Sequence, residues 1–106
     1  MVSDEYLSKI IFAVRRNSNS LLDEELTDII EQGRAELIRV GVPKEVAIDE
    51  TNPLVLGAIR CFARWQTGGG GDDVAFNREG FKILANDLRL STVDLIRTGG
   101  DDEQMD

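Results

Sequence analysis

Histidine is missing from this 106-residue sequence, and cysteine occurs once, as Cys61. Without histidine the chain lacks the commonest general base, the commonest metal ligand and the usual pH switch. A single thiol cannot form an internal disulfide, so the fold does not depend on an oxidising compartment. Serine–histidine–aspartate, cysteine–histidine and Cys-x-x-Cys arrangements are all excluded. We therefore expect neither an enzyme nor a protein that holds a metal or another cofactor.

Long apolar runs and an excess of positive charge are also lacking. No apolar run approaches the ~20 residues that span a bilayer, and the acidic start Met-Val-Ser-Asp-Glu does not resemble a signal peptide. Lysine and arginine number 12 against 20 aspartates and glutamates, which gives a net charge of −8. Because phosphate binding requires a basic surface, we expect no nucleic acid as the main partner. We also expect no membrane contact, and a protein made in the cytoplasm.

Apolar residues recur at helical spacing along most of the chain, and nothing resembles a hairpin turn between strands. The length fits one domain. We predict an all-α bundle of about four helices, over residues 3–16, 21–40, 53–66 and 73–89, with one further helical turn at 44–48. In the last helix the expected apolar contacts come from Phe76, Ile83, Leu84 and Leu88, with Val74 and Phe81 on adjoining faces.

Several residues predict where the helices begin and end. Ser3 is placed to cap the first helix, and Asn52 followed by Pro53 is a strong start signal for the third. Gly41 suits the position just after the second helix. Gly33, inside the second helix, has two interpretations: a tolerated local weakness, or the close approach of another helix.

The helix over residues 53–66 is apolar nearly all round, which is typical of a central, buried helix. Cys61 is expected to be a small core residue there. Arg60 and Arg64 lie four residues apart on its polar strip and need carboxylate or carbonyl partners. The partners are either carboxylates of the second helix or groups on a neighbouring subunit. Trp65 is a candidate for the core or for an interface.

Four consecutive glycines, Gly68 to Gly71, predict a flexible loop. They lack the GxxxxGK[ST] pattern of a phosphate-binding loop. Residues 90–96 are either a last helical turn capped by Ser91 or an extended segment. We expect residues 1–97 to form the single domain and residues 98–106 to be a disordered acidic tail. Asp101, Asp102, Glu103 and Asp106 in that tail account for half of the charge imbalance.

The layout resembles the small helical head–tail connector (adaptor) proteins of tailed bacteriophages and prophages. The resemblance covers roughly residues 3–92 and is carried by residues 21–30 (LLDEELTDII), the Gly-Val-Pro turn at 41–43, the start at residues 52–59 (NPLVLGAI), the aromatic Phe62 and Trp65, and the helix at 76–88 followed by residues 88–91 (LRLS). The pure glycine run and the longer, more acidic tail depart from the family pattern.

The resemblance implies a non-enzymatic virion protein that forms a homo-oligomeric ring. The ring would dock beneath the portal protein at the head–tail junction after assembly in the host cytoplasm, receive the next head-completion or tail protein, and let DNA pass without specific binding. The candidate interface residues are Arg60, Arg64, Trp65, Gly68, Gly69, Gly70, Gly71, Leu90, Val93, Leu95 and Ile96.

Two other functions stay open at this point. One is a non-enzymatic regulatory or adaptor module, similar to an antitoxin or anti-repressor, that binds a basic protein partner. The other is a DNA-binding helical domain. The acidic balance of the chain disfavours DNA binding. About eleven residues separate the second and third predicted helices, too many for a helix-turn-helix.

Overall fold

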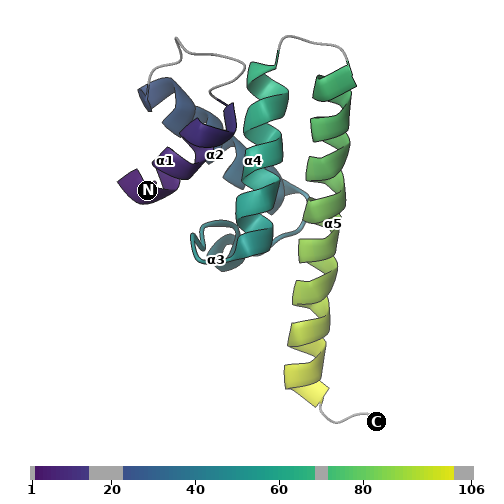
Figure 1. Cartoon of the computed structure of the whole chain (residues 1–106). Helices are drawn as coiled ribbons and strands as arrows, with labels where there is room; N and C mark the ends of the chain where they lie inside the picture. Colours follow the sequence, from purple (N-terminus) through teal and green to yellow (C-terminus); the bar gives the residue numbers. More distant parts are fainter. Residues whose placement is uncertain (1, 15–22, 69–71, 102–106) are drawn as a thin grey trace.

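The computed structural model describes residues 2–14, 23–68 and 72–101. Within these ranges the chain forms helices and no strand, so the all-α prediction is confirmed. The helices are α1 (Asp4–Val14), α2 (Asp23–Arg39), the single turn α3 (Lys44–Ala47), α4 (Pro53–Thr67) and α5 (Asp72–Asp101) (Figure 1). Residues 15–16 and 21–22, predicted to be helical, lie outside the described residues.

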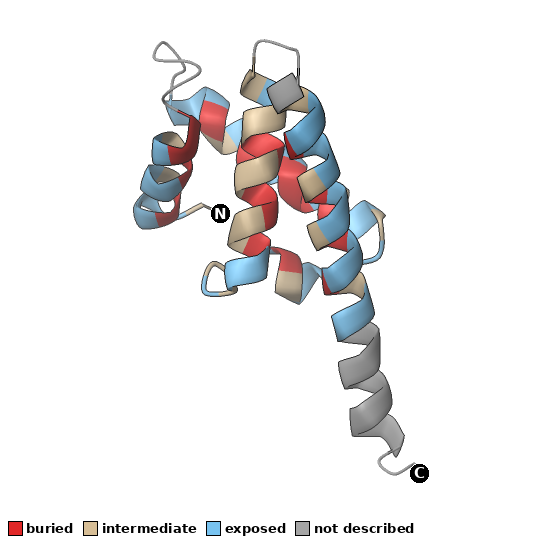
Figure 2. Cartoon of the chain, turned by 45° about the vertical axis from the view of Figure 1, so that its right-hand side comes forward, coloured by how far each residue is buried: buried red, intermediate tan, exposed pale blue. Residues whose placement is uncertain are grey.

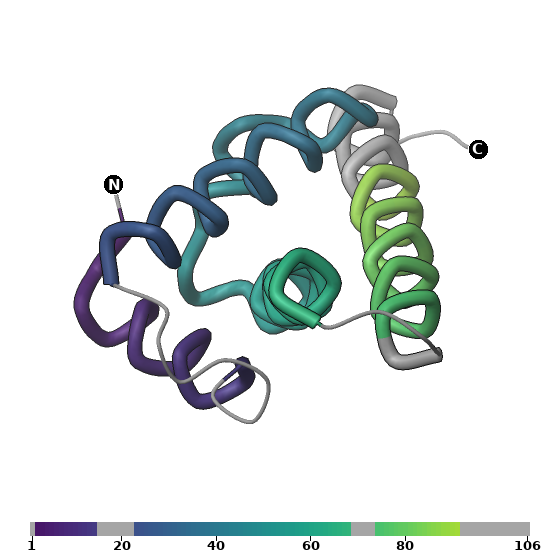
Figure 3. Tube along the Cα trace, turned by 90° about the horizontal axis from the view of Figure 1, so that it is seen from above, coloured from purple at the N-terminus to yellow at the C-terminus, as the bar shows by residue number. Residues whose placement is uncertain are grey.

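Helix α4 lies in the middle of the bundle, as its nearly continuous apolar surface predicts. It packs most extensively against α5 and also contacts α1 and α2. Helix α1 lies on one flank of α4 and α5 on the other, and the two views at right angles agree on this order (Figures 1 and 3). Helix α3 closes one end of the bundle next to α2.

The core is built from the sides of α1, α2 and α5 that face α4, together with the buried residues of α4 itself (Figure 2). The spacing of three or four residues between buried positions places them on one side of each helix. In the four long helices, the apolar residues that are 6% exposed or less are Tyr6, Ile10 and Val14 in α1, Leu26, Ile30 and Leu37 in α2, Val55, Ala58, Ile59, Phe62 and Ala63 in α4, and Phe81, Ala85 and Leu88 in α5.

Asn52 and Pro53 start α4 as the sequence predicts. The Asn52 side-chain oxygen accepts hydrogen bonds from the backbone N–H groups of Leu54, at 2.9 Å, and Val55, at 3.2 Å. Pro53 occupies the first helical position, where its missing N–H removes no hydrogen bond. The cap fixes the entry of the central helix, on which the other long helices pack.

Gly41 ends the second helix with a left-handed backbone conformation, φ 115°. The Gly41 N–H bonds the carbonyl of Ile38 at 3.0 Å, and the Val42 N–H bonds the carbonyl of Leu37 at 2.9 Å. This pair of bonds is the Schellman arrangement, which satisfies the last carbonyls of a helix. This conformation favours glycine, and a Cβ at position 41 would also lie 2.8 Å from Cδ of Arg89, so the arginine side chain would have to shift.

Glycines also mark the closest helix crossings. A Cβ on Gly33 would lie 2.9 Å from Cδ1 of Ile59 and 3.0 Å from Cδ2 of Phe62. Of the two interpretations of Gly33, the close approach of another helix is therefore the one that the structure supports. Gly80 of α5 lies in the same way against Cys61, whose Sγ would be 3.0 Å from the new Cβ.

The boundaries near the glycine run and the C-terminal end differ from prediction. Gly68 caps α4, and its N–H bonds the Arg64 carbonyl at 2.8 Å. Gly69, Gly70 and Gly71 lie outside the described residues. Helix α5 does not stop at residue 89 but continues to Asp101, so residues 90–96 are helical and not extended. Residues 102–106 lie outside the described part of the chain.

Candidate interaction surfaces

Helix α5 carries a second apolar stripe on the side that faces away from α4. Phe76 is 77% exposed, Ile83 60% and Leu90 46%. These residues recur at intervals of seven, which is close to two turns of ~3.6 residues each, so they share one face. The buried residues Phe81 and Leu88 lie on the opposite face. Helix α5 is therefore apolar on two sides, and only one of them is covered within the described chain.

Sequence reasoning placed Phe76 and Ile83 in the core, which is wrong. The core contacts of α5 come from Phe81, Ala85 and Leu88, with Leu84 half-buried beside them. Helical periodicity identifies apolar stripes but does not say which stripe meets the bundle. The exact seven-residue spacing of positions 76, 83 and 90 was the available signal for a separate surface stripe.

The flank opposite α5 carries another large exposed apolar side chain, Phe12 of α1, which is 71% exposed. Since α1 and α5 lie on opposite sides of α4 (Figure 3), Phe12 and the Phe76–Ile83–Leu90 stripe belong to different faces of the molecule. By their exposed fractions, the three stripe residues together offer on the order of 300 Å² of apolar area.

The two arginines of α4 point toward the α1 side of the bundle. Arg64 is half-buried, and its Nε donates a hydrogen bond to the Ala13 carbonyl at 3.2 Å. Its partner is thus a backbone carbonyl of α1, not a carboxylate of α2. Arg60 is also half-buried and acts electrostatically on Tyr6, and it forms no hydrogen bond or ion pair within the described ranges.

Trp65 lies on the other side of α4 and faces α5. Its ring packs edge-on against Phe62, with the centroids 5.5 Å apart, and lies 6.2 Å from the ring of Phe81. The predicted interface residues of α4 therefore do not form one surface, because Arg64 contacts α1 and Trp65 contacts α5. Leu90 lies on the exposed stripe, and the side chains of Val93, Leu95 and Ile96 lie outside the described part of the structure.

A pocket of about 240 Å³ opens where α2, α4 and α5 meet. Its lining is partly apolar: Phe81 and Ala85 are buried, and Val40 and Trp65 half-buried. The charged and polar lining residues are Glu36, Arg39, Lys82, Asn86 and Arg89.

The charges at this pocket are unbalanced. Arg39 donates hydrogen bonds to both carboxylate oxygens of Glu36, and these bonds hold the pKa of Glu36 below its usual value. Glu36 is thus already paired. Arg89 bonds only the neutral amide oxygen of Asn86, at 2.9 Å, and Lys82 is exposed to solvent. Three cations face one carboxylate, in a chain whose net charge is −8.

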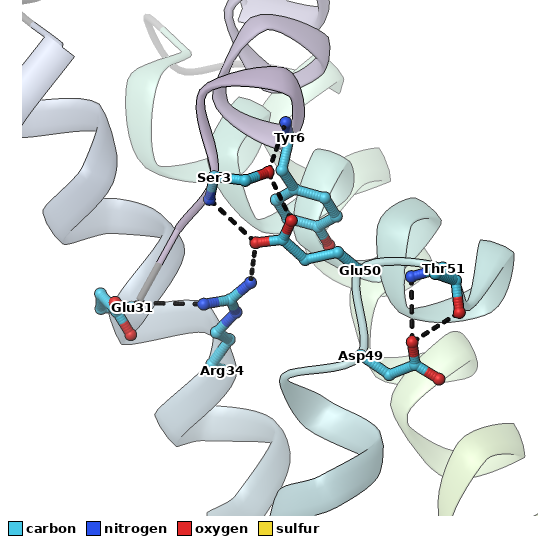
Figure 4. Close-up of polar contacts among 7 residues, drawn as sticks. All are labelled: Ser3, Tyr6, Glu31, Arg34, Asp49, Glu50 and Thr51. Atoms are coloured by element: carbon cyan, nitrogen blue, oxygen red, sulfur yellow. Dashed lines mark hydrogen bonds and ion pairs between the residues drawn. The ribbon is translucent and has the colours of Figure 1, made fainter.

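A polar cluster anchors the start of α1 to the rest of the bundle (Figure 4). Ser3 confirms its predicted role as the cap, since its Oγ accepts the N–H of Tyr6 at 3.1 Å. Ser3 also donates to the two carboxylate oxygens of Glu50, from its N–H at 3.0 Å and its hydroxyl at 2.5 Å. Arg34 of α2 donates to the same carboxylate at 3.1 Å and lies over the Tyr6 ring, 5.3 Å from its centroid.

The pKa values in this cluster follow from burial and hydrogen bonding. Burial raises the pKa of Tyr6 to about 12, and the nearby Arg34 opposes that rise. Burial also acts to raise the pKa of Glu50, but the hydrogen bonds from Ser3 and Arg34 outweigh it and leave the pKa below its usual value. The cluster thus holds an ionised carboxylate against a cation and joins α1 and α2 to the turn before α4, a structural role.

Cys61 is not an activated nucleophile. The side chain is half-buried, and burial raises the pKa of its thiol against the opposing effect of Arg64. The thiol therefore stays protonated at neutral pH, whereas the reactive form is the thiolate. Among the described residues, no group of three or more cysteine, aspartate or glutamate side chains is arranged to hold a metal ion. No helix in these ranges has the length and apolarity to cross a membrane.

No family model matches the chain, and no curated protein or solved structure matches it either. The fold and surfaces define a small all-α domain with an uncovered apolar stripe on its longest helix and a basic pocket beside it.

Proposed function

We propose that the protein is a structural assembly protein that forms a homo-oligomeric ring, of the head–tail connector type, at the portal vertex of a phage or prophage particle. The observation that carries self-association is the exposed stripe of Phe76, Ile83 and Leu90. The proposal that the ring is of the connector type rests in addition on the resemblance in helix order and in the residues that start the helices.

The contact that best fits these surfaces joins the α5 stripe of one copy to the α1 flank of the next, around Phe12. Each surface carries a large exposed phenylalanine, Phe76 on α5 and Phe12 on α1, and the two helices lie on opposite sides of α4 (Figures 1 and 3). Because they differ from each other, every copy keeps one surface free after binding, and the contact repeats head to tail. Such heterologous contacts close into rings when the rotation between copies permits it.

The acidic balance suits a ring through which DNA passes. A net charge of −8 repels phosphates and opposes tight retention of DNA. In this role the partners are other copies of the chain, the portal protein on one side and the next head-completion or tail protein on the other. The protein then belongs to the virion after assembly in the host cytoplasm.

The test compares Ile83→Glu with the matched control Ile48→Glu. Ile48 is also exposed but lies after α3, away from both proposed surfaces. Removing a buried isoleucine from an interface costs about 1.5–3 kcal/mol, so Ile83→Glu should weaken self-association at least roughly tenfold. Both variants should lower the melting temperature of the monomer only slightly, because neither side chain is fully buried.

Analytical ultracentrifugation over a range of concentrations and negative-stain electron microscopy supply the readouts. We expect closed rings for the unchanged protein and for Ile48→Glu, and their loss in Ile83→Glu. A strictly monomeric protein at high concentration, alone and with the portal protein, contradicts the proposal. A one-to-one complex with a basic host protein and no ring favours the regulatory module instead, and retardation of DNA at low salt favours a DNA-binding domain.

A further inference from the structure

The pocket between α2, α4 and α5 combines an aromatic lining with unbalanced positive charge. Trp65 and Phe81 supply the aromatic surface, and Lys82 and Arg89 supply cations that no carboxylate of the described chain neutralises. A suitable occupant is therefore a short acidic segment with an apolar side chain. Acidic groups would meet the cations at the rim, and the apolar side chain would cover the rings.

The chain contains one segment of this kind, Asp-Asp-Glu-Gln-Met-Asp at residues 101–106. It holds four carboxylates and one methionine, whose flexible side chain adapts well to aromatic surfaces. We propose that the pocket of each copy binds residues 101–106 of a neighbouring copy. This inference rests on the proposed self-association and adds a second contact to it.

The length of α5 argues that the segment reaches a neighbour's pocket and not its own. From Phe81, whose ring lines the pocket, to Asp101, the helix rises about 30 Å at ~1.5 Å per residue. Met105 is four residues beyond Asp101, and an extended chain covers at most roughly 14 Å over that length. With α5 helical to Asp101, the methionine of the segment therefore cannot reach the aromatic lining of its own copy. Figure 1 shows this end of α5 projecting past the turn between α2 and α4, where a neighbour can meet it.

The experiment adds a labelled peptide of residues 97–106, with an amidated end, to the intact protein. Fluorescence anisotropy follows the peptide, and the emission of Trp65, the single tryptophan of the chain, follows the pocket. We expect saturable binding with a change in Trp65 emission. Replacing Asp102 and Glu103 of the peptide by Asn and Gln should weaken binding, as should raised salt, because the attraction is between exposed charges.

Lys82→Glu tests the pocket, and Arg78→Glu is the matched control. Both reverse one exposed cation of α5, one turn apart, but only Lys82 lines the pocket. Loss of an exposed ion pair weakens binding by up to about fivefold, and the reversed charge adds a repulsion, so Lys82→Glu should weaken the binding of the peptide by about fivefold. Arg78→Glu should change the affinity less than about twofold, since salt screens a charge outside the contact.

Sedimentation of the same samples separates this inference from the proposed ring. Rings that form while the peptide does not bind, or binds equally to Lys82→Glu and Arg78→Glu, overturn the pocket inference and leave the ring proposal standing. Peptide binding that depends on Lys82 and shifts Trp65 emission supports the pocket even if no ring forms. Equal binding of the neutralised peptide overturns it, because the charge complementarity would then have no role.

Discussion

Arg34 is the residue whose replacement tests the packing of α1 most directly. Its side chain is only 2% exposed, and it connects α2 to Glu50 and to the Tyr6 ring (Figure 4). We predict that Arg34→Gln lowers the free energy of unfolding, because glutamine keeps part of the chain length but removes the charge and the guanidinium donors. Helix α1 should then be the first element to detach from the bundle.

The expected loss can be worked from the contacts. A hydrogen bond to a charged group, such as the 3.1 Å bond to Glu50, is worth about 1.5–3 kcal/mol. The stacking on Tyr6 adds roughly 0.5–1 kcal/mol. Glu50 is partly exposed, and water can solvate it when Arg34 is gone, so the loss stays below the upper end of the ~3–5 kcal/mol seen for broken buried pairs. We therefore expect Arg34→Gln to lower the free energy of unfolding by about 3 kcal/mol, which corresponds to a fall in melting temperature of roughly 12 °C or more for a domain of this size.

Arg39→Gln is the matched control. Arg39 also pairs with a glutamate on α2, but its side chain is 70% exposed, so its removal should leave the melting temperature unchanged within error. Thermal unfolding followed by circular dichroism compares the two variants with the unchanged protein. Equal shifts for both, or no shift for Arg34→Gln, would refute the assignment of the cluster as the anchor of α1.

The pH dependence of the same comparison gives an independent check. The pKa of Glu50 is lower in the folded protein than its ordinary value of 4.5. The stabilisation that the ionised Glu50 provides is therefore complete above pH 4.5, and it is lost as the pH falls through the pKa that Glu50 has in the folded protein. The difference between the unchanged protein and Arg34→Gln should shrink in acid. A difference that stays constant on acidification would mean that Arg34 acts by packing and not through the carboxylate.

The helical glycines, the single tyrosine and Gly41 give further predictions. Gly33→Ala should lower stability in urea unfolding, although alanine is the better helix former by up to ~1 kcal/mol, because its methyl group meets Ile59 at 2.9 Å. Gly57→Ala, whose methyl group has ordinary contact distances of 3.4 Å, should raise stability, and a gain in both variants would refute the close crossing. Tyr6, the single tyrosine, should ionise near pH 12 in the native protein. Because the tyrosine of the unfolded chain ionises first, near pH 10, the free energy of unfolding should fall as the pH rises from 10 toward 12. Tyrosinate absorbance that appears near pH 10 in the native protein would contradict the burial of Tyr6. Gly41→Ala should cost at least ~1 kcal/mol in the same unfolding assay, since φ is 115° there, and an unchanged free energy would contradict that conformation.

The helix ends could be predicted because their signals act over a few residues. The Asn52 cap bonds groups two and three residues ahead, and the bonds at Gly41 lie within the last turn of α2. Such interactions depend on neighbours in sequence, so local residue types are sufficient. The length of α5 could not be predicted in this way, because the sequence left residues 90–96 open between a helical turn and an extended segment, and the helix continues through them to Asp101.

The surfaces were harder to predict because they depend on how helices cross. The pocket joins Glu36, Trp65 and Arg89, which come from three helices far apart in sequence. Their approach depends on small residues such as Gly33, which lets α2 come close to α4. Periodicity alone leaves open both the crossing geometry and which stripe of α5 enters the core, so it predicted neither the pocket nor the exposed stripe.

The exposed stripe is difficult to explain by the stability of the isolated domain. Phe81, Ala85 and Leu88 already pack α5 against the bundle, and Phe76 and Ile83, 77% and 60% exposed, contribute little to the stability of the folded monomer. Apolar groups left in water on a helix of this length favour aggregation unless another surface covers them. Polar replacements at these two positions should therefore leave the monomer nearly as stable and make it more soluble. In the proposed ring, the neighbouring copy covers both side chains and removes this apolar area from water.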